Sequence, residues 1–536
     1  MINKITETVI LEVRKYYAFC DVLDQTIKNV VTPNDNYYKS VYTCFNGFVH
    51  SLESYLLSVY DDIYQNEFTM MPKSNANRIL LRNCLEANLI LNILQNNPLY
   101  ADKFYATLKS DVDRIDETYN ELDQTRIDLK KYMKRFSWLP RIKGKKCTSL
   151  KDLLHFVDFG ENDTLEYYYS TLIKNFDTFI HPSFKFAESI KNKKVGEEIQ
   201  NIAGLFISNG IVFDCCYNIL SNLMSVYEDK INASIYKELS DIITNKEFTL
   251  NDKHQIKDAY LNNKQHIEEY VHSLPYSLIN LGSAIEQVNF KSKNIVYLLY
   301  DLSSHYDDML ISYYIFDTMM FYAQARYVIE SLSLIHCLLK EDEERSEIYY
   351  LHQNIKSYDA KITALNFLNH YYLKGNEDPI DVSNIHIENI ERIRSYYKKN
   401  FNVAVDDNKI LRLNGWALYL KNINNENVPN SPFFVDILGN DLINNKEVTH
   451  YLLGFYEESN AFTHITPYAF DPSQTNFDLT KPLLLINELL QRLTNNIITT
   501  YDLRKKLDEK QFKLIETGLS YTIFKFKNDT VKKGIK

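Results

Sequence analysis

The sequence predicts an all-α protein built as two tandem, similar helical bundles joined by a helical connector. Glycine and proline are scarce, with 13 and 12 in 536 residues, which disfavours a protein of strands and tight turns. No proline interrupts the chain between Pro182 and Pro275 or between Pro275 and Pro379, so long helices can form there. Several sequence landmarks recur in the same order in the two halves, which indicates an internal duplication.

Composition narrows the class of protein before any motif is considered. The chain is 45% hydrophobic and 24% charged, and its 41 Tyr and 29 Phe predict an aromatic-rich core. The net charge of −10 argues against a generally cationic surface for nucleic acid but leaves room for a local basic patch. Seven scattered cysteines without a Cys-x-x-Cys pair predict neither a zinc site nor a disulfide framework. Without an apolar run near ~18 residues or a signal-like start, we expect a cytoplasmic protein with no membrane partner.

The clearest repeat is a short motif that contains a histidine. DTFIHPS at Asp177–Ser183 and NAFTHIT at Asn460–Thr466 share the pattern [Asp/Asn]-x-Phe-x-His-x-[Ser/Thr]. The two tryptophans of the chain, Trp138 and Trp416, each precede one copy of this motif. Each Trp is followed by a Ser that opens an apolar stretch, TSLKDLLHF in one half and NSPFFVDIL in the other. The run FFVDIL fits either a strand or a buried helix.

Further landmarks frame the two copies and set the expected boundaries. An apolar segment with Arg-x-x-x-Glu comes first in each half, and an apolar segment that ends in Tyr comes last. We therefore expect two bundles that pack as a pseudo-dimer within one chain, because two copies are too few for a solenoid. The expected units are repeat 1 at 1–229, a connector at 230–279, repeat 2 at 280–507 and a basic tail at 508–536.

The recurring Arg and Glu lie where a helix should be buried on most sides. Ile79–Leu94 is apolar nearly all the way round, so Arg82 and Glu86, four residues apart, should pair inside the protein. One carboxylate cannot satisfy every donor of a guanidinium, so a third group is expected, and His181 is our candidate. The same argument for the second half groups Arg326, Glu330 and His464.

Two interpretations of these clusters remain open. In the structural one, the network fixes how helices dock, and Ser183 or Thr466 caps the next helix. In the functional one, the histidine is a general acid or base and the arginine stabilises an anionic phosphate, which suits phosphodiester cleavage. One His and one carboxylate per repeat are too few ligands for a metal site, so we expect no metal and no cofactor.

A basic stretch in the first half is the best candidate for contact with nucleic acid. Lys130–Lys151 holds nine basic residues among twenty-two and no acidic one, interleaved with aromatic residues. Basic side chains follow phosphates and aromatic rings stack on bases. The alternative interpretation of this stretch is a solvated loop whose tryptophan side chain packs into the hydrophobic core. The candidate nucleic-acid-binding residues are Lys130, Lys131, Lys134, Arg135, Trp138, Arg141, Lys143, Lys145 and Lys146.

The order Arg-x-x-x-Glu, Trp, then Phe and His before a final helix resembles HEPN-like and abortive-infection-type bacterial all-helical proteins. The resemblance covers both repeats and implies a helical protein of phage defence or a toxin system that acts on RNA. The Arg-x4–6-His pattern of HEPN ribonucleases is matched only by Arg345 and His352, with no counterpart in repeat 1.

Two functions follow as alternatives. One is a metal-independent ribonuclease or other phosphodiester-acting effector, with RNA as its partner. The other is a non-enzymatic sensor or scaffold, with another protein of a defence system as its partner.

Overall fold

The fold is known from a computed structural model, which describes most of the chain in separate ranges. The described residues are 2–30, 35–66, 78–120, 132–133, 135–158, 166, 169–173, 195–228, 230–244, 273–289, 293–315, 317–341, 349, 352, 391, 395, 398–399, 431–470 and 477–515. Within these ranges the secondary structure is helical and contains no strand, apart from an isolated bridge between Ile142 and Lys145. The all-α prediction is confirmed. FFVDIL lies in a helix.

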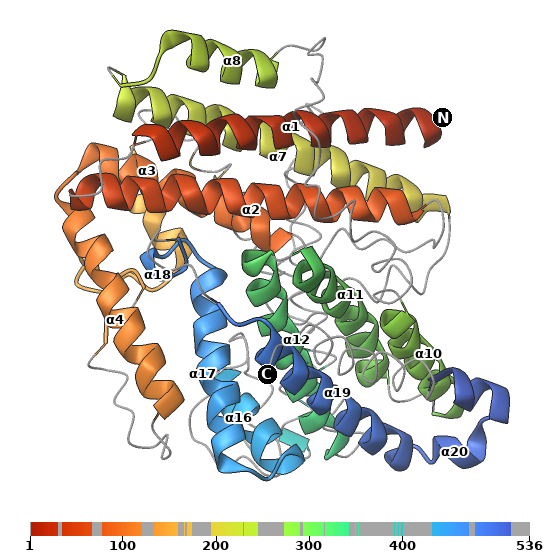
Figure 1. Ribbon diagram of the computed structural model, residues 1–536. Coiled ribbons are helices and arrows are strands. Elements are labelled where there is room, and N and C mark those ends of the chain that lie inside the picture. Colours follow the sequence, from red (N-terminus) through yellow and green to blue (C-terminus); the bar gives the residue numbers. More distant parts are fainter. Residues whose placement is uncertain are drawn as a thin grey trace.

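The helices of the first half form one group. They are α1 (Ile2–Val30), α2 (Asn36–Asn66), α3 (Arg78–Asn96), α4 (Tyr100–Asn120), the 3-10 helix η3 (Leu150–Phe156), α7 (Val195–Tyr227) and α8 (Ala233–Thr244). Helix α2 packs between α1 and α3, and α7 packs against α3. Helix α8, in the range expected as a connector, packs on α1 and α7. Figure 1 shows these helices as the upper layer of the molecule, with α4 descending from it.

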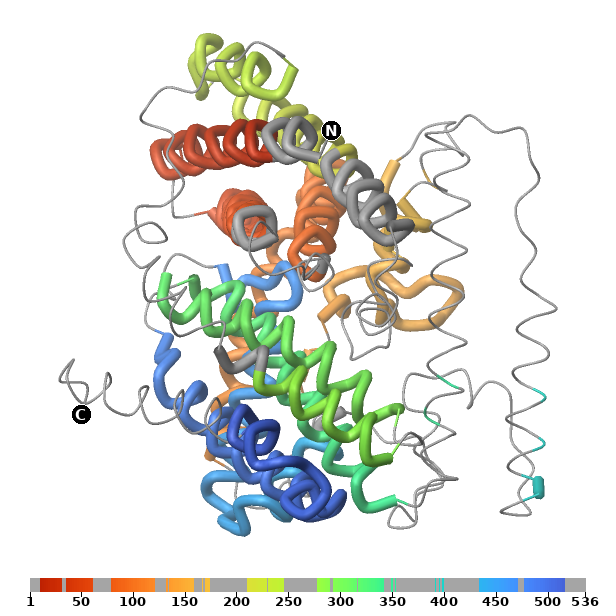
Figure 2. Tube along the Cα trace, turned by 90° about the vertical axis from the view of Figure 1, so that its right-hand side faces the viewer, coloured from red at the N-terminus to blue at the C-terminus, as the bar shows by residue number. Residues whose placement is uncertain are grey.

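The helices of the second half form the other group. They are α10 (Ser273–Val288), α11 (Lys293–Ile315), α12 (Thr318–Leu339), α16 (Ser431–Leu442), α17 (Lys446–Phe462), α18 (Pro467–Phe470), α19 (Thr480–Thr500) and α20 (Leu503–Lys506). Helix α12 is central, because α11, α16, α17 and α19 all pack against it. The two groups lie one above the other in both views (Figures 1 and 2).

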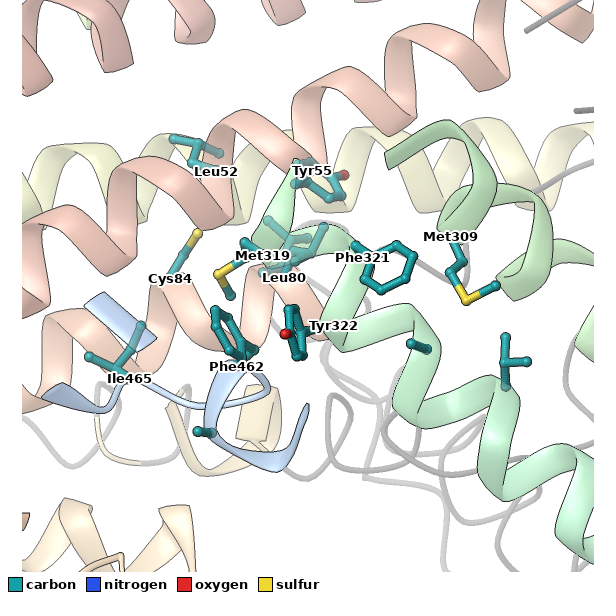
Figure 3. Packing of buried hydrophobic residues seen from close by; sticks show 14 of the residues in the cluster. Leu52, Tyr55, Leu80, Cys84, Met309, Met319, Phe321, Tyr322, Phe462 and Ile465 are labelled. Atoms are coloured by element: carbon teal, nitrogen blue, oxygen red, sulfur yellow. The ribbon is translucent and has the colours of Figure 1, made fainter. Parts of the chain in front are cut away.

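The two groups share one hydrophobic core. Most of their buried apolar residues belong to one continuous cluster, and a small second cluster also joins α3 to α12. The seam between them is visible in Figure 3, where α2, α3, α12, the end of α17 and the turn after it contribute Leu52, Tyr55, Leu80, Cys84, Met319, Phe321, Tyr322, Phe462 and Ile465. Tyr322 and Phe462 stack there with ring centroids 4.3 Å apart and planes 19° apart. Burial of this apolar surface holds the groups together.

Helix α4 crosses from the first group to the second and packs along α17. The two helices approach closely at Gly454, where an added Cβ would lie 2.4 Å from Cδ1 of Tyr119. Only glycine leaves room for the ring at that distance. The close approach fixes the middle of α17 against α4.

The turn between α17 and α18 contains the second histidine motif. Thr463 follows the last residue of α17, and Thr466 precedes α18. The Thr466 hydroxyl accepts a hydrogen bond from the Ala469 N–H at 3.3 Å, so it caps the short helix as the structural interpretation expected. The Asn83 side chain of α3 donates to the Phe462 carbonyl at 3.1 Å, which ties the turn to the first half.

Candidate functional site

Three segments bring their polar residues to one place between the two groups of helices. Helix α3 brings Arg82 and Glu86, and helix α12 brings a second Arg and Glu four residues apart. The turn after α17 brings Thr463 and His464. Ile79 packs with Ala323 and a neighbouring Tyr, so α3 and α12 meet one turn before their arginines. We call this set, with Arg135, Arg326, Glu330 and Tyr456, the central cluster.

The pair on α3, Arg82 and Glu86, contacts the ring of His464. Nη1 of Arg82 lies 2.7 Å from Nδ1 of His464 and donates to the Thr463 carbonyl at 3.1 Å. The same Nη1 lies 3.6 Å from Oε2 of Glu86. Nδ1 of His464 is also 3.3 Å from that carboxylate oxygen. One imidazole nitrogen is therefore within reach of both a cation and an anion.

The protonation state of the ring decides which partner Nδ1 uses. A guanidinium only donates, so the short contact with Arg82 requires Nδ1 to accept, and this assigns the proton of the neutral ring to Nε2. If the proton moves to Nδ1, the ring donates to Glu86 instead and the contact with Arg82 becomes repulsive. The site can thus hold two tautomers with different chemistry, a donor or an acceptor at Nε2.

The pair on α12, Arg326 and Glu330, contacts the same turn through Arg326. Nη2 of Arg326 lies 3.3 Å from Oε1 of Glu330, and its Nη1 donates to the Thr463 hydroxyl at 3.3 Å. The Tyr456 hydroxyl of α17 donates to the same Glu330 oxygen. Burial acts to lower the pKa of Arg326, but the carboxylate of Glu330 and the Tyr456 side chain outweigh it, so the pKa is raised. Arg326 is therefore a permanent cation at the turn.

The expected clusters are joined by the turn after α17. We expected His464 beside Arg326 and Glu330, whereas its Nδ1 lies on the pair of the first half, and Arg326 reaches the neighbouring Thr463. The physical reason is that α3 and α12 converge on one turn. His181, the partner expected for Arg82 and Glu86, lies outside the described residues, as does Trp416.

Arg135 connects the cluster to the basic stretch. Its Nε lies 3.6 Å from Oε1 of Glu86, and its guanidinium lies over the Phe136 ring, 4.1 Å from the centroid. Its side chain is 25% exposed, compared with 14% for His464 and 0% for Glu86. Arg135 was expected to bind nucleic acid, and the structure adds a contact with the expected catalytic carboxylate.

The rest of the basic stretch divides into buried and exposed parts. Trp138 is 1% exposed and packs edge-on against Phe104 of α4 with centroids 5.3 Å apart, so its ring belongs to the core. Lys130, Lys131 and Lys134 lie outside the described residues. Of the candidate nucleic-acid-binding residues that the structure describes, Arg141, Lys143, Lys145 and Lys146 are exposed to solvent.

A tight turn presents these exposed cations. Ile142 and Lys145 exchange two backbone hydrogen bonds of 2.9 Å each. The residues between them, Lys143 and Gly144, have φ angles of 48° and 79°. Two positive φ values in a two-residue loop are typical of a type I′ turn. The chain then enters η3, which packs against α3, the helix that carries Arg82 and Glu86.

A second polar group lies along α4 and α17, beside the cluster. Arg114 of α4 pairs with Glu457 and, at 3.2 Å, with Asp111. Glu458 accepts hydrogen bonds from Tyr119 at 2.7 Å and from the Tyr of α18 at 2.8 Å. Burial raises the pKa of Glu458 although its phenol partners act to lower it. These bonds hold α17 and α18 in position against the first half.

Sequence reasoning missed two residues of the cluster. Thr463 lies inside NAFTHIT, directly before the histidine that was chosen. Tyr456 precedes Thr463 by two helical turns and lies on the same face of α17, so the helical period could have found it once the end of α17 was known. His352 is buried, and Arg345 lies outside the described residues.

In the described part of the chain, no group of three or more His, Cys, Asp and Glu side chains is placed to hold a metal ion. No helix in the same part is both long and apolar enough to cross a membrane. Comparison with known protein families, with characterised proteins and with solved structures returned no significant match.

Proposed function

We propose that this chain is a cytosolic, HEPN-like effector of bacterial defence or stress response that acts on the phosphodiester bonds of RNA without a metal. The observation that carries the proposal is the position of His464, with Nδ1 2.7 Å from the Arg82 guanidinium and 3.3 Å from the Glu86 carboxylate. A proton-transferring group beside a fixed cation and a carboxylate is the set that general acid–base cleavage of a phosphate ester uses.

The roles of the three residues follow from their chemistry. His464 transfers a proton, and Glu86 stabilises the ring when Nδ1 carries the proton. Arg82 offers donors to the negative oxygens of the phosphoryl group. His464 and Arg135 are the more exposed side chains among the described ones that contact Glu86, so substrate reaches the cluster from their side.

The exposed basic turn supports RNA as the partner. Arg141, Lys143, Lys145 and Lys146 carry four positive charges on a short loop with fixed backbone geometry. Charges on a fixed loop lose less conformational freedom when they bind phosphates than charges on a flexible one. The turn follows Arg135 in the chain and leads back to α3, so a strand bound there lies near the helix of the catalytic pair.

We further propose that the two halves arose by duplication and form a pseudo-dimer with the site at their junction. Equivalent helix pairs are in contact in both halves: α1–α2 and α10–α11, α2–α3 and α11–α12, α3–α7 and α12–α19. Ile79 and Ala323, which belong to one small buried cluster, precede Arg82 and Arg326 by the same number of residues. Equivalent residues that meet across a junction support a two-fold arrangement.

The test compares His464→Gln with the unchanged protein. Glutamine keeps an acceptor for Arg82 but cannot transfer a proton, so the fold is retained while cleavage falls by at least ~100-fold. Cleavage of a fluorescent single-stranded RNA is measured with EDTA present, together with growth of the expressing host. His155→Gln, at an exposed position of η3, is the matched control and should leave both unchanged.

The burial of Arg82 and Glu86 favours a second candidate function, a non-enzymatic one. Arg82 is 4% exposed and Glu86 is fully buried, as expected for a network that joins helices in a non-enzymatic sensor or scaffold. On this alternative, His464→Gln and the double variant His181→Ala, His464→Ala lower the melting temperature and no RNA is cleaved by any form of the protein. RNA cleavage that depends on His464 at unchanged melting temperature excludes it.

A further inference from the structure

The carboxylate of Glu86 is shared between two sides of the central cluster. Its Oε1 faces Nε of Arg135 at 3.6 Å, and its Oε2 faces Nδ1 of His464 at 3.3 Å and Nη1 of Arg82 at 3.6 Å. A cation at Oε1 therefore reduces the negative charge available at Oε2, and so weakens the hydrogen bond that Oε2 can accept from the imidazole. Arg135 and His464 share one buried anion, each at its own oxygen.

The contact between Arg135 and Glu86 is the weaker side of this arrangement. At 3.6 Å it is an ion pair but too long for a good hydrogen bond. Nε of Arg135 and Oε1 of Glu86 are themselves buried, but the Arg135 side chain as a whole is 25% exposed, so part of its guanidinium can reach a ligand from solvent. A phosphate group would offer the same guanidinium two oxygens in bidentate geometry, which is the stronger interaction. An anionic ligand can therefore draw Arg135 away from Glu86.

The basic turn determines which ligand arrives there. Arg141, Lys143, Lys145 and Lys146 are exposed and follow Arg135 in the chain. Phe136 is buried beneath the Arg135 guanidinium and Trp138 is buried against α4, so both ends of the segment between the arginine and the turn are anchored. A strand with several phosphates can engage the turn and Arg135 together, whereas a single phosphate cannot.

We propose that Arg135 binds a phosphate group of a nucleic-acid strand and that this binding transfers Glu86 from Arg135 to His464. The inference rests on the proposed function and adds how the ligand switches the site. Arg135 is then a positioning residue, because it acts on the reaction through Glu86.

The transfer changes the tautomer of His464. Without ligand, Nδ1 accepts from Arg82 and the proton is on Nε2, so Nε2 is not a base. When Glu86 loses the charge of Arg135, its Oε2 is a better acceptor for an Nδ1–H. One proton leaves Nε2 for water and one enters Nδ1 from water, so the ring stays neutral. Nε2 can then take a proton from a substrate hydroxyl.

When Nδ1 carries the proton, Arg82 gives up its contact with the ring and keeps its hydrogen bond to the Thr463 carbonyl. On α3 the ring faces Arg82 and Glu86, and Arg326 of α12 binds the hydroxyl of the preceding Thr463. Near Arg135, burial raises the pKa of Asp111 on α4, while Arg114 and Arg135 act to lower it. Arg114 stays on Asp111 when Arg135 turns to the ligand, so that carboxylate keeps a cation.

The experiment follows the tautomer of His464 by long-range ¹H–¹⁵N NMR on the full chain labelled at histidine. The ring signals of His464 are identified as those that are missing from the spectrum of His464→Gln. The probe is a single-stranded 2′-deoxy oligonucleotide, which lacks the hydroxyl for internal attack, and inorganic phosphate serves as the single-charge arm. Binding is measured by fluorescence anisotropy of the same oligonucleotide.

The expected result has three parts. In the unchanged protein His464 carries its proton on Nε2, and saturating oligonucleotide moves it to Nδ1, whereas inorganic phosphate does not. In Arg135→Gln the proton is on Nδ1 without ligand, and the oligonucleotide binds roughly tenfold more weakly and causes no further change. Arg141→Gln, the matched control on the turn, weakens binding but retains the switch at saturation.

Three results would overturn the inference. They are an oligonucleotide that does not bind, an unchanged protein whose His464 tautomer does not respond at saturation, and an Arg135→Gln variant that keeps the proton on Nε2. Cleavage of all-ribose RNA is scored separately. If the tautomer switches and no RNA is cleaved, the proposed ribonuclease function fails while the role of Arg135 stands.

Discussion

Removal of one partner of the buried pair in α12 should destabilise the protein strongly. In Arg326→Met, Glu330 keeps its charge at 5% exposure and loses the guanidinium, while the Tyr456 hydroxyl still donates to it. An uncompensated buried charge costs about 3–5 kcal/mol. Because the Tyr456 hydroxyl still donates to Glu330, we expect a loss near the lower end of that range, about 3 kcal/mol in the free energy of unfolding.

A double variant and an exposed pair make the comparison specific. Arg326→Met with Glu330→Leu removes both charges, so most of the loss should be recovered. Lys28→Met breaks an exposed pair of the same spacing, at 2.6 Å and 58% exposure of the lysine, and should cost about 0.5 kcal/mol or less. Urea unfolding followed by circular dichroism measures all three. A cost below about 1 kcal/mol for Arg326→Met would show that the charge is not buried in solution.

Three further outcomes are expected. Gly454→Ala should lower the free energy of unfolding by about 1–3 kcal/mol, because the added Cβ would meet the Tyr119 ring. The control is Gly144→Ala, whose Cβ meets no neighbour and which bears only backbone strain. Urea unfolding compares the two variants. The raised pKa of Glu458 means that its carboxyl favours folding below about pH 4.5, and that this contribution is lost as pH rises through the folded value. Glu458→Gln should therefore stabilise at pH 7 and not near pH 4, and urea series at both values test the sign. Trp138→Phe should leave a cavity and cost about 1–3 kcal/mol without changing oligonucleotide affinity, so weaker binding by anisotropy at an unchanged fold would contradict its place in the core.

The all-round apolar pattern of Ile79–Leu94 predicted both a helix and its burial, and α3 has both. The same pattern placed Arg82 and Glu86 on one face of that helix, where they pair. Periodicity is local, so it reports which residues share a face of one helix. It therefore could not predict which distant turn packs against that face.

The residues that escaped prediction are those defined by tertiary contacts. His464 lies on a pair from the other half of the chain because α3 and α12 converge on one turn, which no spacing in the sequence encodes. Arg135 was chosen for its charge alone, and its contact with Glu86 depends on the path of the chain after α4. Trp138 fitted both a stacking surface and a core, and only the packing on α4 decides between them.

The continuous core of the two groups makes the chain one cooperative unit. Helix α2 packs against α12, and the Ser51 hydroxyl of α2 donates to the Met319 sulfur at 3.7 Å, so either half produced alone would present this buried seam to water. Two fragments separated between α8 and α10 should each be poorly soluble when expressed singly and should assemble when expressed together. A toxic activity at the junction would then require both fragments at once, which makes the protein suitable for conditional reconstitution from a split gene.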